Sequence, residues 1–187
     1  MPPLRLALVF LFIAGSAPPG HAQGNKTFPT NNEIQLLLTQ TDRAIQRYMP
    51  VIDEELRMSN GGAEAAITDR KVVQALETAA KALKTHPQMF NGPLGFTFFE
   101  WLDDASRNAA LCASAANTEA AKYLMAGDTS KADEMIHLSQ SSTDVSTLIY
   151  TVSENAGSLY ERYLKAEESV VQRCADDPKK GSPAKKQ

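Results

Sequence analysis

The chain has 187 residues, with 19 basic and 22 acidic side chains and a net charge of −3 at neutral pH. Four of its lysines lie after Pro178, so the preceding body of the chain is distinctly acidic. Such a body lacks the basic surface that binding to a phosphate backbone requires, and we expect no nucleic-acid partner.

The N-terminus has the order of segments that is typical of a secretory signal peptide. Arg5 precedes an apolar run over 6–15, and small residues occupy Gly20 and Ala22. The apolar run is much shorter than the roughly 20 residues that a membrane-spanning helix needs. We therefore predict a signal peptide over 1–22 that is cleaved after Ala22, export to the periplasm or the cell exterior, and no membrane span.

Apolar residues recur at alternating steps of three and four over about 31–58, 63–85, 98–123 and 130–175. This period is typical of amphipathic helices, and no segment has the alternation of a strand. We therefore predict an all-α fold, an antiparallel up-down-up-down four-helix bundle over 30–176 with a long last helix. A polar lead, 23–29, precedes it, and the lysine-rich segment 177–187 is predicted to be disordered.

Two helices contain residues that disfavour helical structure. Pro50 predicts a kink or a break in the first helix, because proline cannot donate the backbone hydrogen bond. The last helix contains Ser139-Gln140-Ser141-Ser142-Thr143-Asp144, whose hydroxyl and carboxyl groups compete for backbone hydrogen bonds. This helix either breaks there or extends beyond its neighbours.

The segment 87–102 gathers four of the seven phenylalanines and the only tryptophan between two helical patterns. We call it the aromatic elbow. Large aromatic side chains bury much apolar area, so the elbow is predicted to clamp the surrounding helices. A pocket for a small apolar ligand could also form there, with Phe90, Phe96, Phe99 and Trp101 as its candidate lining.

The apolar spacing of the last helix runs without a slip from Met135 to Val170. Such a seam is typical of helix bundles and coiled coils. An exposed part of the seam would be a surface for a protein partner or for self-association. The candidate contact residues are Val145, Ile149, Val152, Leu159 and Tyr163.

Two polar patterns could indicate a metal site or a catalytic site. Glu134 and His137 have the Glu-x-x-His spacing of di-iron bundles, but the second copy that such sites need is missing. The acids at 100, 103 and 104 lie beside Trp101, in the first turns of a helix, where the helix dipole favours negative charge. No phosphate loop, nucleophile elbow or haem-attachment motif occurs. We expect no catalytic residue, no metal site, no cofactor and no enzymatic activity.

The two cysteines, Cys112 and Cys174, give conflicting signals. An exported protein with an even cysteine count favours a disulfide. A hairpin that turns near Gly127 would instead place them far apart along the last two helices, beyond the roughly 7 Å between Cα atoms that a disulfide spans. We therefore predict no disulfide within the chain, a buried thiol at Cys112 and an accessible one at Cys174, which could join two copies.

These observations favour an exported helical bundle that acts by protein–protein interaction or as a structural component. The alternative function is the binding of a small apolar ligand at the aromatic elbow. An enclosed cavity at the elbow would favour the ligand, whereas a filled elbow and an uncovered apolar stripe on the last helix would favour a protein partner.

Overall fold

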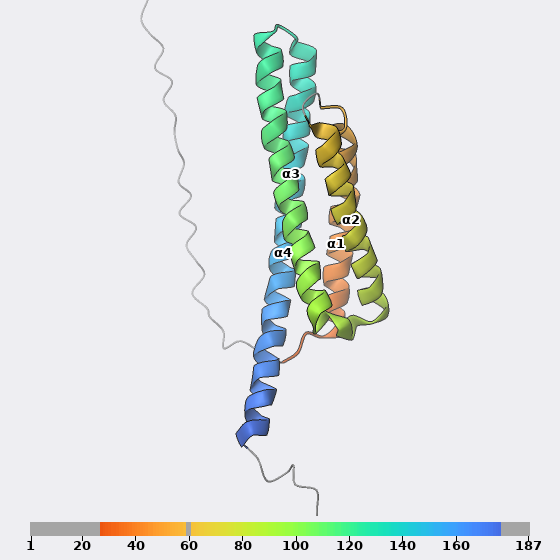
Figure 1. Cartoon of the computed structure of the whole chain (residues 1–187), viewed down its shortest axis with the longest axis vertical. Helices are drawn as coiled ribbons and strands as arrows, with labels where there is room; N and C mark the ends of the chain where they lie inside the picture. Colours follow the sequence, from red (N-terminus) through yellow and green to blue (C-terminus); the bar gives the residue numbers. More distant parts are fainter. Residues whose placement is uncertain (1–26, 59–60, 177–187) are drawn as a thin grey trace, which may run out of the picture.

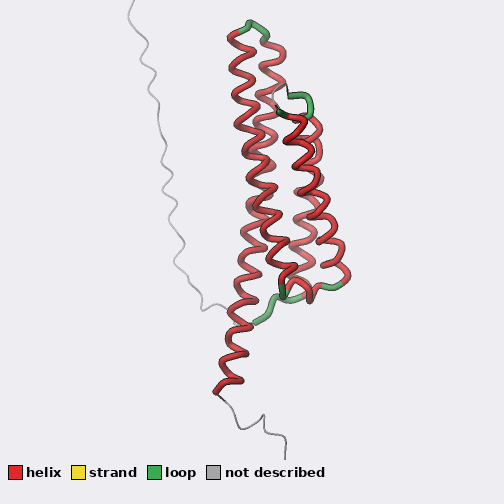
Figure 2. Tube along the Cα trace, in the orientation of Figure 1, coloured by secondary structure: helices red, strands yellow, loops and turns green. Residues whose placement is uncertain are grey.

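The computed structural model describes residues 27–58 and 61–176. It contains the helices α1 (Asn31–Glu55), α2 (Gly62–Thr85), α3 (Pro93–Met125) and α4 (Thr129–Asp176), and a short 3-10 helix, η1 (Pro87–Phe90). Successive long helices run in opposite directions (Figure 1), and no strand occurs in the described residues (Figure 2). The predicted all-α antiparallel four-helix bundle with a long last helix is confirmed. The predicted signal peptide, most of the lead and the predicted disordered tail lie outside the described residues.

Helix α1 begins at a capping box and passes through its proline without a break. The Thr30 hydroxyl accepts a hydrogen bond from the backbone N–H of Glu33, and the Glu33 carboxylate accepts one from the backbone N–H of Thr30. Pro50 lies on the exposed side of the helix, where water can reach the carbonyl group that lacks its helical donor. The predicted break at Pro50 is therefore absent.

The connection between α2 and α3 is shorter than the predicted aromatic elbow. Only His86, η1 and the two residues Asn91 and Gly92 separate α2 from α3. The first residue of α3 is Pro93, a favoured position for proline. Gly95 lies directly against the backbone of Phe90, where an added Cβ would come within 2.0 Å of the Phe90 carbonyl oxygen. This close approach folds η1 tightly onto the first turn of α3.

Helix α4 is continuous over 48 residues and does not break in the serine-rich segment. The hydroxyl of Ser142 donates to the backbone carbonyl of Leu138 at 2.7 Å, and the hydroxyl of Thr143 donates to that of Ser139 at 2.9 Å. These side chains bond to carbonyls of their own helix, four residues back, and leave its backbone ladder intact. At 1.5 Å per residue, α4 is about 72 Å long.

The longest helices, α3 and α4, also make the most extensive contact between any two elements. Small side chains of α3 allow this close approach, and those that are buried are Ala105, Ala109, Ala113, Ala116 and Ala120. The turn between them contains Gly127 with a φ of +78°, which favours glycine. Figure 1 shows the α3–α4 hairpin extending past the α1–α2 loop, and α4 projecting beyond the other helices at its C-terminal end.

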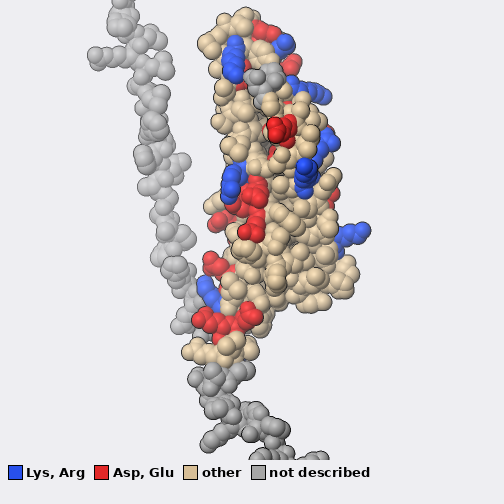
Figure 3. Space-filling model, viewed as in Figure 1, with Lys and Arg blue, Asp and Glu red and all other residues tan. Residues whose placement is uncertain are grey.

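The surface is mixed in charge on the face shown in Figure 3. Acidic and basic side chains are interspersed over the helices, and acidic side chains are prominent near the projecting end of α4. Among the described helices, none combines the length and the apolar character that crossing a membrane requires.

Candidate functional site

Of the four aromatic residues predicted to line one pocket, Phe90, Phe96 and Phe99 gather against residues 157–160 of α4, and Trp101 does not. Phe90 is fully buried, and Phe99 lies partly buried, with its ring in contact with Gly157 of α4. Phe96 is 44% exposed and lies beside Tyr160, with ring centroids 5.8 Å apart. The prediction fails for Trp101, because Trp101 follows Phe99 by two residues, about 200° around α3, and therefore points to a different side of the helix.

Trp101 lies instead in a groove on the outer side of α2 and α3. Its neighbours in this groove include Met89 and Leu94, and the volume of the groove is about 420 Å³. The other lining residues, Gln74, Ala75, Thr78, Ala79 and Ala82, come from α2. The groove is open to solvent and is not an enclosed cavity.

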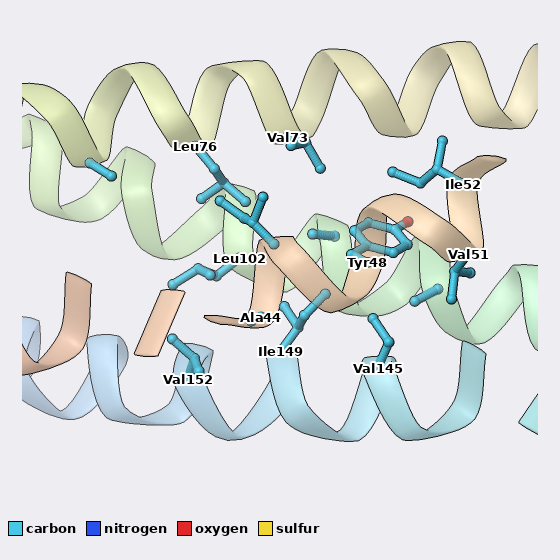
Figure 4. Packing of buried hydrophobic residues seen from close by; sticks show 14 of the residues in the cluster. Ala44, Tyr48, Val51, Ile52, Val73, Leu76, Leu102, Val145, Ile149 and Val152 are labelled. Atoms are coloured by element: carbon cyan, nitrogen blue, oxygen red, sulfur yellow. The ribbon is translucent and has the colours of Figure 1, made fainter. Parts of the chain in front are cut away.

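Three of the five seam residues proposed as a contact surface are core residues. Val145, Ile149 and Val152 are at most 5% exposed. Figure 4 shows them pointing from α4 into the bundle, toward Ala44 and Tyr48 of α1. The seam over this part of α4 is therefore covered within the chain, and these three residues are removed from the candidate surface.

The other two seam residues, Leu159 and Tyr163, are partly buried near the end of the bundle. Tyr163 belongs to a row of four aromatic rings that we call the aromatic row. Its ring centroid lies 6.1 Å from that of Phe28 and 5.6 Å from that of Tyr160, which in turn neighbours Phe96. The row joins the segment before α1 to α4 and α3.

Beyond the aromatic row, α4 presents apolar side chains to solvent. The exposed fractions are 45% for Leu164, 39% for Val170 and 63% for Val171. We call the segment 161–173 the projecting end. It is held to the bundle where it starts, because Arg162 donates two hydrogen bonds to Glu33 of α1, at 2.8 and 2.5 Å. This pair, with the Thr30 bonds, lowers the pKa of Glu33 to about 2.

Two of the three acidic residues considered for a catalytic role form ion pairs on the surface. Asp103 and Asp104 both lie against Arg107, at 2.7 and 3.7 Å between charged atoms. Their charge is offset by this arginine, so they do not form the isolated carboxyl pair that a general acid requires.

The Glu-x-x-His pair on α4 is also exposed. Glu134 and His137 line a shallow pocket together with two cationic residues, Arg57 and Lys131. Nearby positive charge opposes metal binding, and in the described part of the chain no group of three His, Cys, Asp or Glu residues is arranged to hold a metal ion.

A buried polar cluster lies on the inner faces of α1, α2 and α3. Asp69 is 2% exposed, and it accepts a hydrogen bond from the Tyr48 hydroxyl at 2.5 Å and one from the Asn108 amide at 2.7 Å. Burial raises the pKa of Tyr48, and so does its bond to the Asp69 carboxylate. Burial also raises the pKa of Asp69, although its hydrogen-bond donors oppose the shift.

A second buried carboxyl group, that of Glu55, lies beside Asp69. It is 4% exposed. Burial and the neighbouring Asp69 carboxylate raise its pKa to about 7. Cys112 completes the cluster as a buried free thiol that accepts a hydrogen bond from Ser142 at 3.3 Å, and burial raises the pKa of this thiol to about 12. The burial predicted for Cys112 is confirmed, whereas the side chain of Cys174 lies outside the described residues.

Sequence reasoning missed this cluster, although a signal for it was present. Glu55 continues the core spacing of α1 after Tyr48 and Ile52, and Asp69 precedes Val73 by one step of four in α2. Acids at core positions are costly unless they are paired or protonated, so two of them in adjacent helices predict a shared buried site.

Comparison of the chain with protein-family models, with curated proteins and with solved structures finds no match. Its function is therefore argued from its own geometry.

Proposed function

We propose that the protein is an exported helical bundle that acts by protein–protein interaction and not by catalysis, through the projecting end of α4. One observation carries the proposal. Leu164, Val170 and Val171 are exposed on a helix that continues past the helices that would cover it (Figure 1). Val170 continues the seam of α4, whereas Leu164 and Val171 lie beside it. Exposed apolar side chains on a projecting helix are typical of surfaces that pair with another helix.

The partner that fits the projecting end is a second copy of the chain. The segment 161–173 has three acidic and three basic side chains, so it is neutral although the body before it is acidic. Two acidic bodies repel each other, whereas two neutral ends can approach. An antiparallel pair of projecting ends keeps the bodies at opposite ends and gives the twofold symmetry that most homo-oligomers have.

Two features fix the direction of the projecting end. The bidentate Arg162–Glu33 pair ties the start of this segment to α1. The aromatic row packs Tyr163 against Phe28, which precedes α1. A helix that is held at its base presents its apolar side chains in one orientation, which lowers the entropy lost on pairing.

The alternative function, binding of a small apolar ligand near the elbow, is supported by the apolar groove that Trp101 lines with Met89 and Leu94. This groove is open, and three of the four predicted aromatic residues do not line it. The protein-partner proposal is therefore preferred. Export remains an inference from the residues at 1–22, which follow the order of a signal peptide.

Light scattering on the purified protein over a range of concentrations tests the proposal. We expect a dimer for the wild type and a monomer for Val171→Glu, because a charge at this position opposes the burial of the apolar surface. Ile67→Glu is the matched control, because Ile67 is also exposed, at 53%, but lies on α2. A wild type that stays monomeric at the highest soluble concentration, or a dimer that Val171→Glu leaves intact, contradicts the proposal.

A further inference from the structure

The pocket that Glu134 and His137 line lies beside the α3–α4 hairpin. The hairpin extends past the α1–α2 loop (Figure 1), so α1 ends partway along it. The pocket lies at this step, between the end of α1 and the first turns of α4, and its volume is about 390 Å³. That volume is within the roughly 300–1,000 Å³ of typical small-molecule sites. We call it the hairpin pocket.

The floor of the hairpin pocket is apolar. Leu138 is buried, and Met135 is partly buried against the core. Tyr123 of α3 contributes an aromatic ring, and the Lys131 ammonium group lies over this ring, 5.4 Å from its centroid. A thioether and an aromatic ring both make favourable contacts with hydrocarbon and aromatic groups. The floor therefore suits the apolar part of a ligand, and the cation–π contact holds Lys131 at its edge.

Each wall of the hairpin pocket carries one acid and one cation, a single turn apart. At the end of α1, the backbone N–H of Arg57 donates to the carbonyl oxygen of Glu54 at 2.9 Å, which closes that turn. On α4, Lys131 and Glu134 are three residues apart, so their side chains lie on the same side of the helix. No ion pair among the described residues joins any of these four side chains to another. The two walls therefore face the pocket with charges that direct contact does not neutralise.

The charges of the walls restrict what the ligand can be. Apart from His137, two positive and two negative side chains line the pocket, so a ligand with a single charge would be attracted by one pair and repelled by the other. A ligand with one positive and one negative group instead meets an opposite charge for each. The four charged residues are exposed to water, so each pairing contributes little by itself and the apolar floor must add to it.

We infer that the hairpin pocket binds a free α-amino acid with a large apolar side chain. The carboxylate of the ligand accepts hydrogen bonds from Arg57 and Lys131, and its ammonium group donates to Glu54 and Glu134. Both groups are attached to one carbon atom, so the ligand bridges the two walls while its side chain lies on the apolar floor. The pocket lies about 35 Å along α4 from the start of the projecting end, so it does not depend on the proposed protein partner.

Calorimetric titration of the full chain with L-phenylalanine tests the inference. We expect saturable binding at low ionic strength, where the charges are screened least. Hydrocinnamate lacks the ammonium group and phenethylammonium lacks the carboxylate, so each should bind at least about tenfold more weakly. Glycine lacks the apolar side chain and should not bind measurably. Absence of saturable binding by the folded wild type, or equal binding of either singly charged analogue, overturns the inference.

Exposed positions allow variants that leave the core untouched. Arg57→Gln with Lys131→Gln removes both cations, and Glu54→Gln with Glu134→Gln removes both acids; all four residues are exposed. Each double variant should bind L-phenylalanine at least about tenfold more weakly than the wild type does. Arg47→Gln is the matched control and should bind as the wild type does, because Arg47 is an exposed arginine of α1 outside the pocket. Circular dichroism checks that each variant is folded, and wild-type affinity in either double variant overturns the inference.

Discussion

At the scale of single residues, the buried carboxyl pair makes the stability of the bundle depend on pH. Glu55 ionises near pH 4.5 in the unfolded chain and near pH 7 in the folded protein. Between these values the folded state holds a proton that the unfolded state has lost, so stability falls as the pH rises. Asp69, whose pKa burial also raises, acts in the same direction.

Urea denaturation at pH 5 and pH 8 measures this effect. We expect the free energy of unfolding of the wild type to fall by about 1–3 kcal/mol between these values through Glu55 alone. Glu55→Gln should lose most of this decrease, and Glu54→Gln should retain it. Glu33 has the opposite effect on the pH dependence of stability. Its pairing with Arg162 lowers its pKa from 4.5 to about 2, so the stability that this pair contributes is lost as the pH falls from 4.5 toward 2. Equal pH dependence in the wild type and Glu55→Gln would show that Glu55 is solvated.

The buried cluster also shows what sequence reasoning can find at this scale. Cys112 was predicted as buried because its neighbours in α3 are alanines at core spacing. Glu55 and Asp69 occupy equally regular core positions, but apolar spacing alone gives no weight to a polar residue on the stripe. The hydrogen bonds from Tyr48 and Asn108 to Asp69 join α1 and α3 to α2, and only the packing of these helices in the structure reveals them.

At the scale of elements, periodic spacing predicted all four helices, and local sequence predicted their interruptions poorly. Pro50 was expected to kink or break α1, and the serine-rich segment either to break α4 or to leave it extending beyond its neighbours, which is what the structure shows. Both are tolerated because tertiary packing holds the helix on either side, and because the serine and threonine hydroxyls bond back to their own helix. The length of the aromatic elbow was also overestimated, because α3 already begins at Pro93 and most of the segment 87–102 belongs to this helix.

The elbow makes a prediction about the order of two core substitutions. Phe98 is 0% exposed, whereas Trp101 is only partly buried and lines an open groove. Phe98→Ala should lower the free energy of unfolding by about 3–5 kcal/mol, because it leaves a cavity in the core. Trp101→Ala should cost about 1–3 kcal/mol, because solvent can occupy the vacated groove. Chemical denaturation measures both, and a larger loss for Trp101→Ala would mean that the tryptophan, not Phe98, clamps the helices.

At the scale of the whole molecule, the proposed protein-partner function rests on the unequal lengths of the helices. The seam of α4 was predicted correctly as a helix-pairing pattern, but the sequence does not show where α1, α2 and α3 stop covering it. The structure assigns Val145, Ile149 and Val152 to the core and leaves Leu164, Val170 and Val171 exposed at the projecting end. The candidate surface therefore moved along the same helix by about five to six turns.

The orientation of the proposed dimer can be read from Cys174. If two projecting ends pair antiparallel about any point between Leu164 and Val171, the two Cys174 positions are offset by at least six residues. That offset is about 9 Å along the helix axis, more than the roughly 7 Å between Cα atoms that a disulfide can span. A parallel pair would instead bring the two Cys174 positions side by side.

We therefore expect a protein that is a dimer by light scattering and yet runs as a monomer in non-reducing electrophoresis after mild oxidation of the folded state. Cys174→Ser should change neither result, because the antiparallel dimer does not depend on a covalent bond. A covalent dimer in the wild type that disappears in Cys174→Ser would require the parallel arrangement. The two acidic bodies would then lie next to each other, and the dimer should weaken when the ionic strength is lowered, since salt screens the repulsion between them.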